Sequence, residues 1–145
     1  MASVQEITNN INSAYHTYMA ELVLAGDGWE KKPAAGGSGE DAWCARQVAE
    51  HICGSCGFFA SGIVKQLGGQ AAPSAPVKLA TADEAMAAMP GAHAKLTGVL
   101  KDIKPDQLSA AMEFGPLGKT NLENVLGVLA YHYKDHAGQL KALRG

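Results

Sequence analysis

The sequence is poor in the residues that favour β-structure and in cysteine. Aromatic residues make up 6% of its 145 positions, and β-branched residues are few. Because both types favour strands, this composition disfavours an all-β architecture. Three cysteines are too few for the disulfide framework of a small secreted domain and suit a reducing compartment. We therefore expect a cytoplasmic protein that is rich in helix.

Long apolar runs and an excess of basic charge are missing as well. The longest apolar stretch lies between His51 and Lys65, well short of the roughly 18 to 20 residues that cross a bilayer. Residues 1–25 lack the basic start and apolar centre of a signal peptide. Twelve Lys and Arg against fourteen Asp and Glu give a formal charge of -2, which provides no basic field for a phosphate backbone. We expect neither a membrane nor nucleic acid as a partner.

The residues that are abundant point to helices. Alanine, the best helix former, is the commonest residue, and a hydrophobic fraction of 47% with 18% charged residues is ordinary for a globular chain. The length predicts a single domain over residues 1–145. Glycine and proline cluster between four segments in which apolar residues recur at steps of three and four, at 3–25, 38–67, 81–103 and 120–143.

Capping signals set the expected helix boundaries. A Ser or Thr is followed three residues later by an acid at three segment starts: Ser38 with Asp41, Thr81 with Glu84, and Thr120 with Glu123. Pro90 is expected to kink or split the third helix, and Pro105 to end it. A short helical turn is expected around 106–111, followed by an irregular piece over 112–119.

Four amphipathic helices in one domain of this size predict an all-α four-helix bundle. The connections at 26–40 and 68–80 are longer than those of a simple up-and-down bundle. They indicate that a crossover topology is possible.

Two histidines stand in the apolar stripe of the last helix. His132 and His136 are four residues apart, so their side chains are neighbours on one face. A buried imidazole needs a partner for each ring nitrogen, and two of them in one apolar seam are costly unless something binds both. A metal ion would meet this need.

A third ligand has to come from another helix. His51 lies close to the stripe residues Val48 and Ile52 of the second segment. Three neutral imidazoles on two helices leave at least one coordination position open, as in catalytic rather than closed structural sites. His16 lies off the stripe of its helix and is expected in solvent. For His93, a fourth-ligand role and a core or rim position both remain open.

Rival sites can be tested directly against the sequence. A di-iron carboxylate bundle needs Glu-x-x-His pairs, which are missing, and the zincin motif needs a Glu where Tyr133 follows His132. Residues 115–120 read Gly-x-x-Gly-Lys-Thr, but the position that must be glycine in a P-loop is Glu113. We interpret this segment as a turn and helix cap.

The cysteines give a weaker signal. Cys53 and Cys56 form a C-x-x-C inside a long helix rather than at the start of one, and at 100° per residue both point away from His51. We expect packed or edge cysteines there, and Cys44 as a possible cleft residue on the His51 face. Two aromatic residues are expected in the core or at an interface: Trp43 and Tyr131.

Two stretches resemble the DinB-like (DinB/YfiT-like) family. Residues 43–52 place a His eight residues after a Trp, and residues 132–140 read His-x-x-x-His followed by Gly-Gln-Leu. The resemblance implies a four-helix bundle with crossover topology, a frequent homodimer, and a zinc, nickel or iron ion on His51, His132 and His136. Better-understood members are transferases or isomerases that use low-molecular-weight thiols such as mycothiol or bacillithiol.

The functional hypothesis is a divalent-metal-binding protein that acts as a thiol-dependent transferase or isomerase, or as a hydrolase, on an unknown small molecule. Gln47, Asp135 and Gln139 are candidates for orienting the ligands. The alternative is a non-catalytic metal-binding or thiol-responsive stress or regulatory dimer. An open pocket at the ion, with room for cofactor and substrate, favours the first. A sealed ion, or one with a fourth protein ligand such as His93, favours the second.

Overall fold

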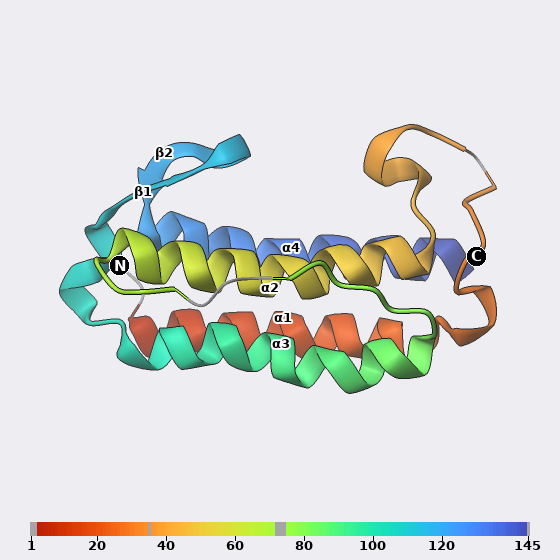
Figure 1. Ribbon diagram of the computed structural model, residues 1–145, viewed down its shortest axis with the longest axis horizontal. Helices are drawn as coiled ribbons and strands as arrows, with labels where there is room; N and C mark the ends of the chain where they lie inside the picture. The colour runs from red at the N-terminus through yellow and green to blue at the C-terminus, as the bar shows by residue number, and fades with distance from the viewer. Residues whose placement is uncertain (1–2, 35, 72–74, 145) are drawn as a thin grey trace.

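The computed structural model describes residues 3–34, 36–71 and 75–144. Four long helices lie side by side in a bundle, which confirms the predicted all-α class (Figure 1). They are α1 (Val4–Leu22), α2 (Ala45–Gln66), α3 (Ala82–Asp102) and α4 (Leu122–Arg144). The shorter elements are the 3-10 turns η1 (Gly26–Gly28), η2 (Gly39–Ala42), η3 (Pro105–Ser109) and η4 (Gly115–Leu117), and the strands β1 (Ala111–Phe114) and β2 (Gly118–Asn121).

The helix directions establish the crossover. In Figure 1, α1 and α4 run one way along the bundle and α2 and α3 run the other way. α1 packs mainly on α4, and α2 mainly on α3, so each close pair is parallel. The chain between α2 and α3 must therefore return from one end of the bundle to the other, which accounts for the length of that connection.

The cap expected at Thr81 is confirmed. Its side chain accepts a hydrogen bond from the backbone N–H of Glu84 at 3.1 Å, and the Glu84 carboxylate accepts one from the backbone N–H of Thr81 at 3.1 Å. α3 then continues through Pro90 without a break, so the expected split is wrong. Pro90 is exposed, where the carbonyl that loses its partner can be solvated.

The other two predicted caps are wrong. Ser38 and Asp41 belong to the region of η2, and α2 begins only after Cys44. Thr120 lies in β2, where strand pairing holds its backbone extended. The side chain of Asn121 instead accepts from the backbone N–H of Asn124 at 2.9 Å, so α4 starts at Leu122.

A β-hairpin stands where an irregular piece was expected. β1 and β2 pair antiparallel, with Met112 opposite Thr120 (Figure 1). The buried side chains of Met112 and Phe114 alternate with exposed ones, which is the strand pattern. The side chain of Gln66 on α2 bonds both the backbone N–H and the carbonyl of Glu113, and so attaches the hairpin to the bundle.

The core lies between the four helices, and Ile11, Tyr18, Ile52, Leu126 and Leu140 are among its most buried side chains. None of the helices in the described part of the chain is long and apolar enough to cross a membrane.

Candidate metal centre

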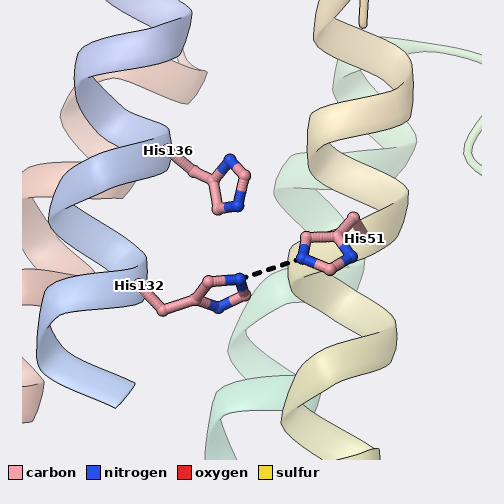
Figure 2. A group of neighbouring side chains, drawn as sticks. All are labelled: His51, His132 and His136. Carbon is pink, nitrogen blue, oxygen red and sulfur yellow. Dashed lines mark hydrogen bonds between the residues drawn. The ribbon is translucent and has the colours of Figure 1, made fainter. Parts of the chain in front are cut away.

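Three imidazoles from two helices converge between α2 and α4. Figure 2 shows His132 and His136 on successive turns of α4, both directed toward His51 on α2. Each ring offers one nitrogen to a cluster in which these atoms lie within 4.8 Å of one another. The two Nε2 atoms of His51 and His132 are 2.9 Å apart. The spacing of four residues on α4 is what stacks two rings on the same face.

The surroundings keep two of these rings neutral. Burial, followed by the neighbouring His136 and His51, lowers the pKa of His132 to about 3. Burial also lowers the pKa of His51, and His136 adds to this while Glu40 opposes it. Near pH 7 both rings are therefore uncharged, and each has a nitrogen lone pair available to a cation.

Gln139 orients the third ring. Its amide nitrogen donates to the backbone carbonyl of Glu40 at 2.6 Å, so its amide oxygen faces Nδ1 of His136 at 2.8 Å. Because an amide oxygen only accepts, the neutral ring of His136 carries its proton on Nδ1. The Nε2 lone pair then points toward the cluster, as it does in metal-bound histidines that donate from the other nitrogen.

Glu40 adds a carboxylate that sequence reasoning missed. Its Oε1 lies 3.4 Å from Nε2 of His136 and 3.9 Å from Nε2 of His51. The side chain is 58% exposed, so this side of the cluster faces solvent. The sequence carried no specific signal for it, since Glu40 occurs in a Gly-rich loop whose path depends on the tertiary fold.

Trp43 forms a wall of the site. Its ring is nearly parallel to that of His136, with centroids 6.3 Å apart, and tilted against that of His51 at 5.0 Å. A role in the core or at an interface was expected, and Trp43 does pack against the core as well as on two site histidines. Tyr131, which was also expected in the core or at an interface, is exposed on α4.

Of the three polar residues considered for orienting the ligands, Gln139 bonds a site histidine. The side chain of Gln47 accepts from the backbone N–H of Cys44 at 3.0 Å and from Lys32 at 2.8 Å, and so caps the start of α2. Asp135 is exposed on α4.

His93 occupies a core network outside the cluster. Nδ1 lies 2.8 Å from the hydroxyl of Tyr133, Nε2 lies 2.8 Å from Oδ1 of Asn12, and the ring stacks on Tyr15 at 3.9 Å. Both ring nitrogens are thus engaged, so the geometry favours the core position over the fourth-ligand role. His16 is exposed, as expected.

The cysteines are buried and lie outside the histidine cluster among the described residues. Burial raises the pKa of Cys56 to about 11, while its Sγ lies 3.1 Å from the hydroxyl of Tyr133. Burial raises the pKa of Cys53 as well. A thiol in such surroundings is protonated and unreactive. Cys44 is buried at the start of α2.

A cleft adjoins the site on the far side of Trp43 and Gln139. It has a volume of about 470 Å³ and lies between the loop at 31–34 and the end of α4. Lys31, Lys32 and Arg144 contribute to its lining, together with apolar side chains. Because Gln139 also bonds His136, the cleft and the cluster share a wall.

Comparison with known proteins places this crossover bundle in a known class of helical proteins. The DinB superfamily model matches residues 15–140, and the chain belongs to this superfamily. Its structure resembles that of the colibactin self-resistance protein ClbS, solved in complex with a dsDNA, with a TM-score of 0.71 and 14% sequence identity. The match covers 99% of this chain and 96% of that one. No curated protein matches the chain.

The comparison with ClbS corrects the exclusion of nucleic acid. ClbS, which shares this fold, is in complex with a dsDNA. Net charge is a sum over the whole chain, whereas phosphate contacts depend on where individual Lys and Arg side chains lie. A formal charge of -2 is therefore no ground for excluding nucleic acid as a partner of this fold.

Proposed function

We propose that the protein binds one divalent metal ion through His51, His132 and His136 and uses it to activate a small molecule. The observation that carries this proposal is the convergence of three ring nitrogens within 4.8 Å of one another. The Nε2 atoms of His51 and His132 are 2.9 Å apart, a contact in which one N–H can donate to the other nitrogen and which a bound cation would replace. Imidazole donors suit zinc, nickel and iron.

Residues around the cluster orient its histidines and leave it accessible to solvent. Gln139 fixes the ring of His136, and Trp43 packs over two of the rings. The side chain of His51 is 33% exposed, so the cluster is reached from solvent, which supports an open site over a sealed one. A divalent ion held there would lower the pKa of a bound nucleophile and polarise a substrate oxygen.

The reaction class we propose is transfer or isomerisation with a low-molecular-weight thiol, or hydrolysis. The chain's own thiols are buried, and the pKa of Cys56 is raised to about 11, so a separate thiol has to supply any sulfur nucleophile. The adjoining cleft of about 470 Å³, which Trp43 and Gln139 separate from the ligands, offers room for part of a small molecule that extends past this wall.

Metal analysis tests the site. Protein purified without nickel resin is expected to carry one ion per chain, and His132→Ala to lose it. His16→Ala is the matched control, because that histidine is exposed outside the cluster. Wild-type protein that binds no zinc even when zinc is in excess would contradict the proposed site. Metal binding by His132→Ala that equals that of the wild type would contradict it as well.

Activity is tested with metal-loaded and chelated protein against electrophiles in the presence of several thiols, and against hydrolase substrates. Turnover that needs the metal and is lost in His132→Ala supports the enzyme. Stoichiometric metal without turnover supports the non-catalytic alternative. Double-stranded DNA belongs in the same binding screen, because ClbS is in complex with it.

The homodimer and the cytoplasmic location implied above stay predictions. Sedimentation analysis of the full chain tests the first, and fractionation of cells tests the second.

A further inference from the structure

We propose that the carboxylate of Glu40 is a fourth metal ligand, carried to the cluster by the turn η2. This inference rests on the proposed three-histidine site and adds a protein oxygen to its three nitrogens. With Glu40 bound the ion has four protein ligands, so the carboxylate has to give way before a small molecule can bind the ion. Glu40 has the only carboxylate within 4.0 Å of a site imidazole in the described ranges 3–34, 36–71 and 75–144.

Two distances from Glu40 are those of atoms that share an ion. Donors bound at about 2.1 Å are separated by about 3.0 Å at a right angle, about 3.4 Å at the tetrahedral angle and about 4.2 Å when opposite. Oε1 of Glu40 lies 3.4 Å from Nε2 of His136 and 3.9 Å from Nε2 of His51. The ring nitrogens of the three histidines lie within 4.8 Å of one another, so the rings have to close slightly to share an ion. The carboxylate is thus as near to two of the rings as donors to one ion are.

The hydrogen bonds leave one nitrogen of His136 facing Glu40. The amide oxygen of Gln139 accepts from Nδ1 of His136, so Nε2 is the atom that faces Glu40, 3.4 Å from its Oε1. A proton on Nε2 would make this contact an ion pair, and a divalent ion bound between the two atoms would take the place of that proton.

The position of Glu40 is anchored by its backbone. Its carbonyl accepts from the amide nitrogen of Gln139 at 2.6 Å and from the backbone N–H of Trp43 at 3.1 Å. The first bond joins η2 to the helix that carries two ligands, and the second joins it to the wall of the site. The side chain can therefore reach the ion although it is 58% exposed.

The test measures zinc affinity by competition with a chelator for the full chain and for Glu40→Gln. Gln keeps the size of the side chain and removes its charge and much of its ligand strength. We expect affinity to fall by about 10- to 100-fold, the range known for groups that support a metal site. The control is Asp41→Asn, which removes the same charge from the next residue of the same exposed loop. We expect Asp41→Asn to lower the zinc affinity by less than about threefold, since salt screens exposed charges.

Cobalt substitution gives a second readout. The visible absorption of bound Co²⁺ depends on the number and type of its ligands, so Glu40→Gln should change the spectrum and Asp41→Asn should not. Unfolding curves of the metal-free proteins check that both variants fold as the wild type does.

The outcomes separate this inference from the proposed function. Wild-type protein that binds no zinc defeats the three-histidine site and the role of Glu40 together. Wild-type binding that depends on His132 but is unaffected by Glu40→Gln, or equally affected by Asp41→Asn, defeats the role of Glu40 alone.

Discussion

The side-chain oxygen of Gln139 lies 2.8 Å from Nδ1 of His136 and determines which nitrogen of that ring faces the other histidines. The amide nitrogen of the same side chain holds Glu40, a residue 99 positions away in the sequence. One amide therefore orients a ligand and fixes the turn that lies over the site. Its loss should reduce metal affinity without removing a ligand.

We predict that Gln139→Leu weakens zinc binding about tenfold, because His136 is then free to rotate or to change its tautomer. Chelator competition measures the effect. Gln66→Leu is the matched control, since that glutamine also makes two hydrogen bonds, both to the backbone of Glu113. Equal losses in the two variants would show that general destabilisation, rather than ligand orientation, is responsible.

The hydroxyl of Tyr133 joins the four helices. It lies 3.1 Å from Sγ of Cys56 on α2 and 2.8 Å from His93 on α3, and His93 in turn bonds Asn12 on α1. Tyr133→Phe leaves buried polar groups without a partner, so we predict a loss of about 1 to 3 kcal/mol in the free energy of unfolding. Urea denaturation of the metal-free protein measures it.

Tyr18→Phe is the control for that substitution. The hydroxyl of Tyr18 is buried and has no hydrogen-bond partner among the described residues. Removing it is expected to leave the free energy of unfolding within about 0.5 kcal/mol or to raise it. A cost equal to that of Tyr133→Phe would contradict the role assigned to the network.

Gly62 makes room for the hairpin. A Cβ at this position of α2 would collide with the ring of Phe114 on β1. We predict that Gly62→Ala destabilises the fold by about 1 to 3 kcal/mol, because the ring or the strand must move. Gly127→Ala is the control, since a Cβ there meets nothing within 4 Å and alanine is the better helix former. That change should stabilise the protein by about 0.5 to 1 kcal/mol. Chemical denaturation measures the free energy of unfolding of both variants. A Gly62→Ala protein as stable as the wild type would refute the packing argument.

His93 should make stability depend on pH. Burial, with a smaller effect of His16, lowers the pKa of His93 to about 4 from an ordinary value of 6.5. Between these values the unfolded chain takes up a proton that the folded one does not. Stability from this group is therefore complete above pH 6.5 and is lost as pH falls toward 4, by about 3 kcal/mol in all.

Unfolding of metal-free protein between pH 7 and pH 4 measures this dependence. His93→Gln should reduce the slope of the free energy of unfolding against pH by the contribution of about one proton. His16→Gln, at an exposed position, should leave this slope as in the wild type. An unchanged slope in His93→Gln would mean that other groups cause the loss of stability in acid.

Sequence patterns predicted those features that depend on neighbouring residues in one helix. The spacing of His132 and His136 placed two rings on one face, and the Thr81 cap marked the start of α3. The position of His51 close to the apolar stripe of its helix then indicated which helix would supply the third ligand. These relations survive folding because helix geometry alone fixes them.

Features that depend on the path of loops were missed. Glu40 and Trp43 reach the site only because residues 39–43 fold back on α4 through Gln139. The hairpin escaped prediction because each strand has four residues, too few for a clear alternation, and because Gln66 anchors it from a distant helix.

The distance along the chain between His51 and His132, 81 residues, bears on how long the folded protein lasts. Contacts between such remote residues carry a large entropic cost of loop closure, so we expect the cluster to be complete only late in folding. An ion bound there is then expected to stabilise the native state but not the preceding transition state. Zinc is therefore expected to slow unfolding and leave the folding rate unchanged, which lengthens the lifetime of each folded molecule.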